Sequence, residues 1–402
     1  MNIREKRSSS SGLFLAILFG AFLGGCVNGP TQAPNYSAPL PAGGTALRPV
    51  QPGNIPNLVE AWKNRDSGLR KALEGSIHWY TYPSSQSRFP YQTSSGEITH
   101  ADAKASVERF YEVLVTSRNA DQFDQTIRDE FQVYESVGWN GKGIVLFTGY
   151  YAPEFDASRD KNSQFRHPVY RRPTDLVTHP KDGKPLGQRQ ADGSITRYPT
   201  RAEIEDSKMH EGNELLWMES SLDAYVVHVN GSAKLTMPDG EVVFIGYDGK
   251  TDRPYTGLGS ELISEGLLDK DELSLGAIYT LHDRNPGGVE RLIRRNDNYV
   301  YFTEYDGSTW PSGSLGVKVQ PRASLATDKE VYPPGAVCLV DTQGVTVSGR
   351  KTEFLRFMLD QDTGGAIKAP GRGDIYMGEG DTAESLAGGQ YAEGRLYYFF
   401  LR

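Results

Sequence analysis

The spacing of apolar side chains divides the chain into helical and β-rich sections. In three early segments apolar residues recur at roughly helical spacing, which predicts helices over 57–76, 102–116 and 121–131. A helical pattern returns at 260–295, where Asn-Pro-Gly-Gly at 285–288 predicts a break. The opening section of the folded chain is therefore expected to be helical.

From Gly143 onward, short apolar runs separated by Gly, Pro and Asp predict strands. Thr200 and Glu203 form a capping box, which predicts one short helix over 201–208 within this section. Pro238-Asp239-Gly240 predicts a hairpin turn. After Asn298 we expect β structure to the end of the chain. The predicted strands include residues 144–147, 169–171, 224–229, 234–237, 242–245, 299–302 and 396–401. These patterns indicate a mainly β chain with α elements, of the α+β class.

Composition narrows the class of protein without identifying it. With 402 residues, 38% of them apolar and 23% charged, the chain can bury full-sized cores, and two domains are expected. The formal net charge of −8 argues against a nucleic-acid partner, which would favour a basic surface.

The N-terminus has the features of a secretion signal. Basic residues precede an apolar run at 12–25 that is too short for a typical membrane-spanning helix. Leu23-Gly24-Gly25-Cys26 resembles the bacterial lipobox, in which the cysteine is lipidated. Residues 1–26 are therefore expected to be a lipoprotein signal peptide; the alternative is a secretory signal that merely contains a cysteine. Val27-Asn28 lacks an aspartate at the second position, which favours the periplasmic face of a Gram-negative outer membrane.

The Pro- and Gly-rich residues 27–52 are predicted to be a flexible tether. If Cys26 is acylated, Cys338 is the remaining thiol, and no internal disulfide can form. Cys338 lies in an apolar run, where cysteine usually behaves as a small buried hydrophobe.

Several common chemistries lack their motifs. The seven histidines show no metal-binding spacing, so no metal site is predicted. There is no Gly-x-Ser-x-Gly nucleophile motif. Gly249-Lys250-Thr251 resembles the end of a phosphate loop, but Phe244 stands where the leading glycine is required. No cofactor is expected.

Two carboxylates stand out in a glycine-rich stretch near the C-terminus. Asp362 and Asp374 lie twelve residues apart, and Asp374 begins the strand-like run Asp-Ile-Tyr-Met. Glycine permits the close backbone approach that clefts require. Such carboxylates suit general acid–base chemistry on a sugar, although aspartates also shape turns. The 22 tyrosines could stack on sugar faces or fill β-sheets.

These residues carry a family resemblance. Asp362-x-Gly-Gly-Ala-Ile-Lys and Asp374-Ile-Tyr-x-Gly-x-Gly are similar to the three-aspartate domain of the A-type membrane-bound lytic murein transglycosylases, with Asp328 as the first aspartate. Other motifs match in family order. They are Thr148-Gly149-Tyr150-Tyr151, Tyr170-Arg171-Arg172-Pro173, Asn230-Gly231-Ser232 and Pro254-Tyr255-Thr256-x-Leu258-Gly259.

The resemblance implies a fold and an activity. It implies a double-psi β-barrel built from residues 53–151 and 297–402, a smaller β-rich domain inserted at 152–296, and a groove between them. The expected substrate is the peptidoglycan glycan strand, cleaved between N-acetylmuramic acid and N-acetylglucosamine to leave 1,6-anhydromuramoyl ends. Other cell-wall enzymes are potential partners.

The resemblance also assigns residues. Asp374 falls at the catalytic position, as general acid and then base, and Asp362 and Asp328 are candidates for its support. Expected sugar contacts are Thr148, Gly149, Tyr150, Tyr151, Ser232, Ala366, Ile367 and Lys368. Two other functions stay open. A glycan-binding module would keep the barrel without chemistry, whereas a hydrolase would need a second acid, such as Glu154, Asp156 or Asp328.

Overall fold

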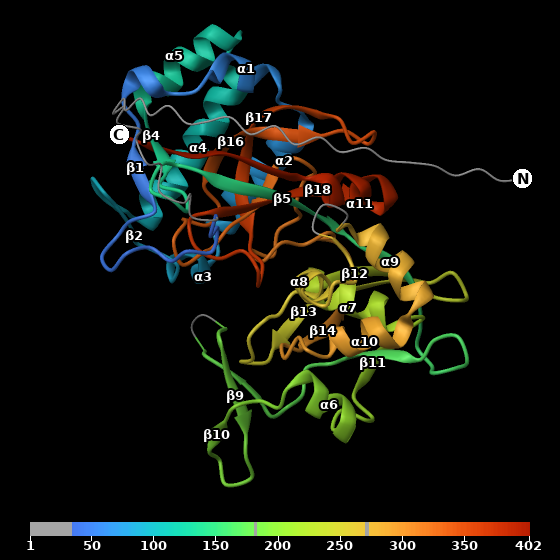
Figure 1. The fold of residues 1–402 in the computed structure, drawn as a ribbon. Helices are drawn as coiled ribbons and strands as arrows, with labels where there is room; N and C mark the ends of the chain where they lie inside the picture. The colour runs from blue at the N-terminus through green and yellow to red at the C-terminus, as the bar shows by residue number, and fades with distance from the viewer. Residues whose placement is uncertain (1–33, 181–182, 270–272) are drawn as a thin grey trace, which may run out of the picture. The chain divides into compact units, whose positions relative to one another are not determined.

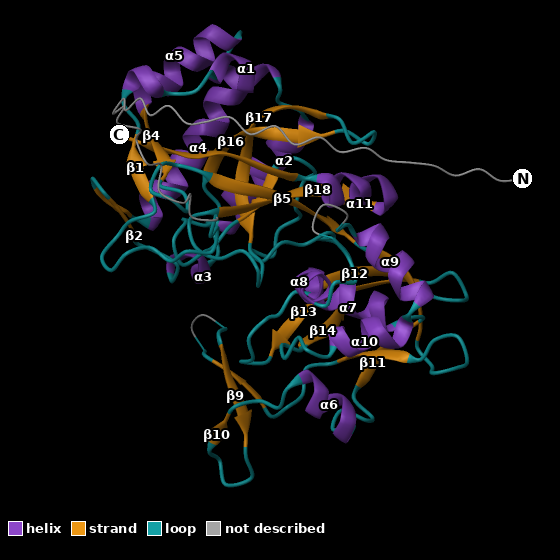
Figure 2. Cartoon of the chain, viewed as in Figure 1, coloured by secondary structure: helices purple, strands orange, loops and turns teal. Residues whose placement is uncertain are grey.

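The computed structural model describes residues 34–180, 183–269 and 273–402. Helices and strands fall largely into separate runs along these residues, in agreement with the predicted α+β class (Figures 1 and 2). The predicted signal peptide at 1–26, with Cys26, lies outside the described residues.

The N-terminal section is largely helical, as predicted. Its elements are β1 (Leu47–Pro49), α1 (Leu58–Lys63), α2 (Ser67–Trp79), α3 (Pro83–Gln86), β2 (Tyr91–Thr93), β3 (Gly96–Ile98), α4 (His100–Thr116), α5 (Ala120–Glu130) and β4 (Phe131–Ser136). The segment predicted as one helix over 57–76 is two, because Asn64 ends α1 and Asp66 caps α2 by accepting from Gly68 and Leu69 amides. The predicted tether at 27–52 overlaps β1, in which Leu47 is buried and pairs with Ser136.

Six strands form a closed ring. They are β5 (Val145–Ala152), β15 (Ser324–Ala326), β16 (Val337–Val345), β17 (Lys351–Asp362), β18 (Arg372–Glu379) and β19 (Tyr391–Leu401). The hydrogen-bonded order is β19-β16-β17-β15-β18-β5, and β5 pairs in turn with β19. The sheet is therefore a barrel built from distant parts of the chain, which is compatible with the expected double-psi topology. The last strand lies inside the sheet, as predicted.

The segment between β5 and β15 builds a second sheet. Its six strands, in hydrogen-bonded order, are β14 (Val300–Tyr305), β13 (Val242–Lys250), β12 (Ser232–Thr236), β6 (Glu154–Ser158), β11 (Glu214–Met218) and β7 (His167–Tyr170). A small sheet contains β8 (Leu176–Thr178), β9 (Pro185–Arg189) and β10 (Ile195–Thr196). The predicted boundary at residue 297 separates β14 from β13, the strand with which it pairs.

Five helices accompany these sheets. They are α6 (Arg201–Ser207), α7 (Ser221–Asn230), α8 (Leu258–Ser264), α9 (Leu275–Arg284) and α10 (Pro286–Ile293). The capping box of Thr200 and Glu203 is confirmed. The predicted break at 285–288 is confirmed, because α9 ends where Asn285 caps α10. The helical section predicted over 260–295 is interrupted a second time, since α8 ends at Ser264 and α9 begins at Leu275.

Two predicted β segments are helical. Residues 224–229 lie in α7, where Ser220 caps the first turn and Gly231, with φ of 75°, ends the helix. The continuous apolar run misled the prediction, because periodicity alone does not distinguish a buried helix from a buried strand. Helix α11 (Gly380–Gly389) interrupts the C-terminal section that we predicted to be all β. Its glycines masked the helical pattern.

One hydrophobic core joins the barrel to the N-terminal helices. Phe110 of α4 makes edge contacts with Phe357 of β17 and Phe123 of α5, and all three rings are buried. Cys338 of β16 is fully buried in this core, as expected. Figure 1 shows α1, α2, α4 and α5 grouped beside the barrel strands. The helices therefore fix one side of the barrel, away from α7–α10.

A substitution at Gly394 tests the closure of the barrel. It pairs with Val145 of β5, and a Cβ at this position would collide with the backbone carbonyl of Asp341 in β16. We expect Gly394→Ala to lower the free energy of unfolding by about 1–3 kcal/mol, because backbone must shift. Urea unfolding measures the change.

The control variant is Gly276→Ala in α9, where an added Cβ meets nothing within 4 Å. It should leave stability unchanged or raise it by up to about 1 kcal/mol. Equal stability of the two variants would contradict the close approach of Gly394 to the Asp341 carbonyl.

Candidate active site

The parallel pairing of β5 with β18 brings Asp374 beside Thr148. The register places Asp374 opposite Thr148 and Tyr376 opposite Tyr150. Since alternate residues of a strand share one face, these four side chains project to the same side of the sheet. Thr148 Oγ1 donates a hydrogen bond of 2.8 Å to Asp374 Oδ1. A hydroxyl from one chain segment thus orients a carboxylate from another.

The surroundings of Asp374 suit a proton-transferring group. Burial raises the pKa of Asp374 to about 6. The Thr148 hydrogen bond and the positive charge of Arg372 oppose this rise in pKa, whereas the negative charge of Asp362 adds to it. A carboxyl with this pKa is substantially protonated in mildly acidic solution and ionised in mildly basic solution. It can donate a proton and later accept one.

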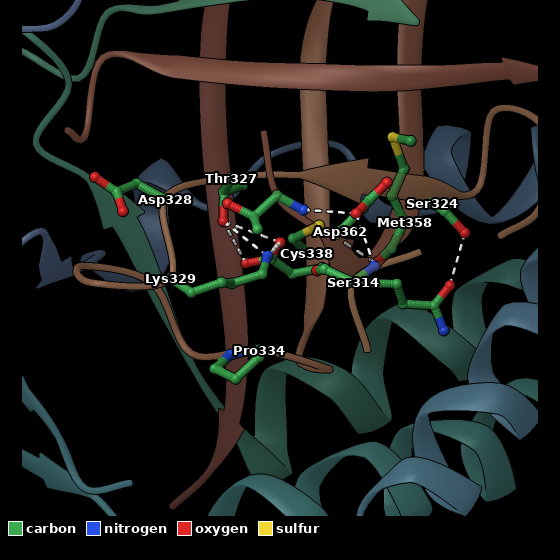
Figure 3. Close-up of polar contacts among 12 residues, drawn as sticks. Ser314, Ser324, Thr327, Asp328, Lys329, Pro334, Cys338, Met358 and Asp362 are labelled. Carbon is green, nitrogen blue, oxygen red and sulfur yellow. Dashed lines mark hydrogen bonds and ion pairs between the residues drawn. The ribbon is translucent and has the colours of Figure 1, made fainter. Parts of the chain in front are cut away.

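Asp362 contacts the hydroxyl of Tyr150. Its carboxylate accepts hydrogen bonds of 2.8 Å from Tyr150 Oη and from the backbone N–H groups of Ser314 and Thr363. Burial raises the pKa of Asp362 despite these donors. Figure 3 shows the Asp362 side chain close to Ser314. Asp362 therefore holds the Tyr150 ring in place and influences Asp374 through its charge.

Asp328 supports the loop before Asp374. Its Oδ2 accepts a 2.7 Å hydrogen bond from the N–H of Ala369, and its Oδ1 accepts one of 3.1 Å from Glu330. In Figure 3 the Asp328 carboxylate points away from Asp362. Ala369 has φ of 65°, a left-handed conformation that is uncommon for alanine and needs such an anchor. Asp328 is buried and does not line the groove described next.

A groove of about 710 Å³ lies in front of Asp374. Both the barrel and the segment between β5 and β15 contribute to its walls. From the barrel side it is lined by Gly149, Tyr150, Tyr151, Ala366, Lys368, Arg372, Asp374 and Glu384, and from the other side by residues that include Tyr225, Val229, Asn230, Tyr255 and Leu258. Aromatic and aliphatic surface beside a few polar groups is typical of a small-molecule or sugar site.

The sequence-predicted contacts divide into three groups. Gly149, Tyr150, Tyr151, Ala366 and Lys368 line the groove, and Thr148 adjoins it through Asp374. Ile367 is only 3% exposed, beneath the loop. Ser232 begins β12, pairs with Gly246, and is not among the lining residues.

Sequence reasoning missed two charged residues of the groove. Arg372 donates from Nη2 to Thr148 Oγ1 at 3.1 Å, and strand periodicity could have identified it, since it lies two residues before Asp374 on the same face. Glu384 comes from α11, the helix that was predicted as β. Burial raises the pKa of Glu384, against a hydrogen bond from Tyr151.

Neither a metal site nor a membrane span is found in the described ranges. Within them, no group of three or more His, Cys, Asp or Glu side chains could hold a metal ion. None of the helices in the same residues combines the length and apolar character needed to cross a membrane.

The hydrogen bond from Thr148 generates a direct prediction. Thr148→Val removes a donor that stabilises the ionised carboxylate, so the pKa of Asp374 should rise above about 6. Titration of ¹³C-labelled aspartate carboxyls by NMR measures it, and Asp374→Asn assigns the resonance. An unchanged or lowered pKa in the Thr148→Val protein would contradict the role given to this hydrogen bond.

Comparison with known proteins places this geometry in a family. The model of the MltA specific insert domain matches residues 146–303, and the model of the 3D domain matches residues 323–400. Membrane-bound lytic murein transglycosylase A of Escherichia coli K12 is 30% identical over 285 residues, which are 70% of this chain and 71% of that protein. The protein of the same name from Vibrio cholerae serotype O1 is 29% identical over 271 residues, 66% and 68% of the two chains.

Comparison with solved structures leads to the same family. A membrane-bound lytic murein transglycosylase from Agrobacterium tumefaciens superimposes with a TM-score of 0.72 and 26% identity, covering 89% of this chain and 98% of that one. Escherichia coli MltA with bound chitohexaose gives a TM-score of 0.66 at 24% identity, over 90% and 95% of the chains, and supports the fold alone. The chain therefore belongs to the family of the A-type membrane-bound lytic murein transglycosylases.

Proposed function

We propose that this protein is a lytic transglycosylase of peptidoglycan. It cleaves the β-1,4 bond between N-acetylmuramic acid and N-acetylglucosamine and leaves a 1,6-anhydromuramoyl end. The observation that carries the proposal is Asp374, a half-buried carboxyl with its pKa raised to about 6 that lines a groove of about 710 Å³. The relatives named above support the reaction and the substrate.

In the proposed mechanism Asp374 acts twice. Protonated Asp374 donates its proton to the glycosidic oxygen as the bond from that oxygen to the muramoyl anomeric carbon breaks, and the bonding electrons leave with the oxygen. The muramoyl 6-hydroxyl oxygen then attacks the anomeric carbon. Its proton passes to the Asp374 carboxylate, which restores the acid. Because an internal hydroxyl replaces water, no second carboxylate is needed to activate water.

Neighbouring residues support this single acid and base. Thr148 orients the Asp374 carboxyl through its hydrogen bond, and Asp362 raises the pKa of Asp374 through its charge. General acid–base catalysis supplies roughly 10²–10⁴-fold in rate, so binding along the groove and ring distortion must supply the rest. We assign that binding to Gly149, Tyr150, Tyr151, Ala366 and Lys368, which line the groove, and not to the buried Ile367 or to Ser232, which lies outside the lining.

We also propose how the enzyme is held. Lipid on Cys26 would anchor it to the periplasmic face of the outer membrane, since two or more acyl chains bind a membrane stably. The tether is then shorter than the predicted 27–52, because β1 begins at Leu47. Several relatives are named membrane-bound.

The hydrolase alternative is favoured by one observation, a second carboxyl in the groove. Of the three acids suggested from sequence, Glu154 pairs with Lys234 at 3.0 Å, Asp328 binds the Ala369 amide, and Asp156 lies in β6. None of them lines the groove. Among the described residues Asp374 and Glu384 are the lining carboxyls, so a water-activating base would be Glu384.

Analysis of the products tests the proposal. Mass spectrometry of murein digested by the protein should show fragments one water lighter than hydrolysed ones, and Asp374→Asn should abolish them. We expect a loss of at least about 10²-fold in kcat/KM, because acid–base catalysis disappears. Hydrated reducing ends would refute the transglycosylase reaction, and murein binding without cleavage would favour the binding module.

Glu384→Gln separates the two enzymatic alternatives. A transglycosylase should keep its anhydro products and lose less than about tenfold in kcat/KM, since Glu384 takes no part in proton transfer. A hydrolase that depends on Glu384 for water activation would lose about as much activity as Asp374→Asn does. Kinetics on the same murein preparation, with both variants side by side, decide the matter.

A further inference from the structure

The groove contains two cationic side chains that form no ion pair with an acidic side chain among the described residues. Lys368 and Arg372 both line it, and neither makes an ion pair or a hydrogen bond to a carboxylate within the part of the chain that the structure describes. Arg372 donates hydrogen bonds only to neutral acceptors, namely Thr148 Oγ1 at 3.1 Å and the Ala366 carbonyl at 3.5 Å, while its positive charge lowers the pKa of the nearby Asp374.

The geometry leaves these cations available to a ligand. The ammonium of Lys368 is exposed and makes no contact with a protein acceptor among the described residues. The guanidinium of Arg372 is fixed by Thr148, and its Nε–H is buried without a partner. Of the five N–H donors of the Arg372 guanidinium, one makes a close hydrogen bond. The other N–H groups remain able to donate to a carboxylate of a ligand.

We infer that Arg372 and Lys368 form an anion subsite for a carboxylate carried by the muramic acid unit of the glycan. The inference rests on the proposed function. N-acetylglucosamine is uncharged, whereas muramic acid carries a lactyl carboxyl, which is free in stem-less strands and amide-linked to a peptide in others. The stem peptide itself ends in carboxylates. Arg372 lies two residues from Asp374 on the same strand face, about 7 Å along the strand, so the subsite adjoins the muramoyl ring that Asp374 acts on.

This subsite would let the groove distinguish muramic acid from N-acetylglucosamine, which Asp374 and the aromatic walls of the groove do not. Stacking surfaces accept any β-1,4-linked N-acetylated sugar. A cation cluster beside the acid favours the sugar that bears the carboxylate and sets which of two alternating residues occupies the cleavage position. The subsite would therefore fix the register of the strand in the groove.

Binding measurements test the inference apart from catalysis. In the Asp374→Asn protein, calorimetry compares oligosaccharides of equal length: a neutral N-acetylglucosamine oligomer, a stem-free muramic acid oligomer, the methyl ester of that oligomer, and one with stem peptides. We expect the free acid to bind about tenfold more tightly than its methyl ester, the gain typical of a charge-assisted hydrogen bond. The difference should shrink as salt rises through about 0.15 M.

Variants locate the effect. Lys368→Gln changes a side chain with no protein partner in the described residues, so the variant should fold normally. We expect this variant to lose most of the difference in affinity between the free acid and its methyl ester. Lys71→Gln, an exposed lysine on α2, changes the net charge equally and should leave the preference intact.

The outcomes are distinct. If only the stem-bearing oligomer gains affinity, and Lys368→Gln removes that gain, the carboxylate belongs to the stem and the subsite stands. Equal affinity for acid, ester and stem-bearing oligomers, or a preference untouched by Lys368→Gln, would overturn the subsite while the neutral oligomer still binds. Failure to bind any of the four oligomers would overturn the proposed function together with it.

Discussion

The parallel pairing of β18 with β5 is the constraint on which the site depends. Thr148 and Asp374 are 226 residues apart in the chain, yet the register places them side by side. A slip of one residue would turn Asp374 to the opposite face of the sheet, away from the groove. Closure of the barrel fixes that register, because β5 is hydrogen-bonded to β18 on one edge and to β19 on the other. A strand held on both edges cannot slide.

Within this frame the acidity of Asp374 results from opposed effects. Burial, the strongest, disfavours the carboxylate and raises its pKa, and Asp362 adds a like charge. Thr148 and Arg372 favour the carboxylate and limit the rise. A group that must donate and then accept a proton needs a pKa near the working pH, since either extreme would make one of the two transfers slow. The Tyr150 hydroxyl contributes indirectly, by holding Asp362.

Much of the fold could be predicted from local signals. Capping residues predicted α6 and the break between α9 and α10, and apolar runs predicted several strands, among them β5, β12, β13, β14 and β19. The failures have physical causes. Helix α7 is a buried apolar run whose only helical signals are its caps, Ser220 and Gly231. Helix α11 is glycine-rich, and β1 lies in a Pro- and Gly-rich segment where only its pairing with β4 makes it a strand.

The candidate site was predicted less completely than the fold. The motifs identified Asp374, Thr148 and Tyr150, because short patterns carry them. Arg372 and Glu384 stand in no pattern that we used, and their place in the groove depends on pairing and on a helix that the glycines concealed. Long-range contacts of this kind are set by tertiary structure, which overrides local propensity.

The three aspartates of the motif have different roles around the loop that joins β17 to β18. Asp362 lies before this loop, Asp374 follows it, and Asp328 binds its backbone. Asp328 holds Ala369, and the hydroxyls of Tyr332 and Ser136 both donate to the carbonyl of Pro370. Gly371 follows, where a Cβ would press against Trp139, so only glycine fits. The end of the loop is thus fixed to the barrel immediately before Arg372 and Asp374. Because the anchors lie behind the strand, the face toward the groove is left to Lys368, Arg372 and Asp374, and the acid is positioned before any substrate arrives.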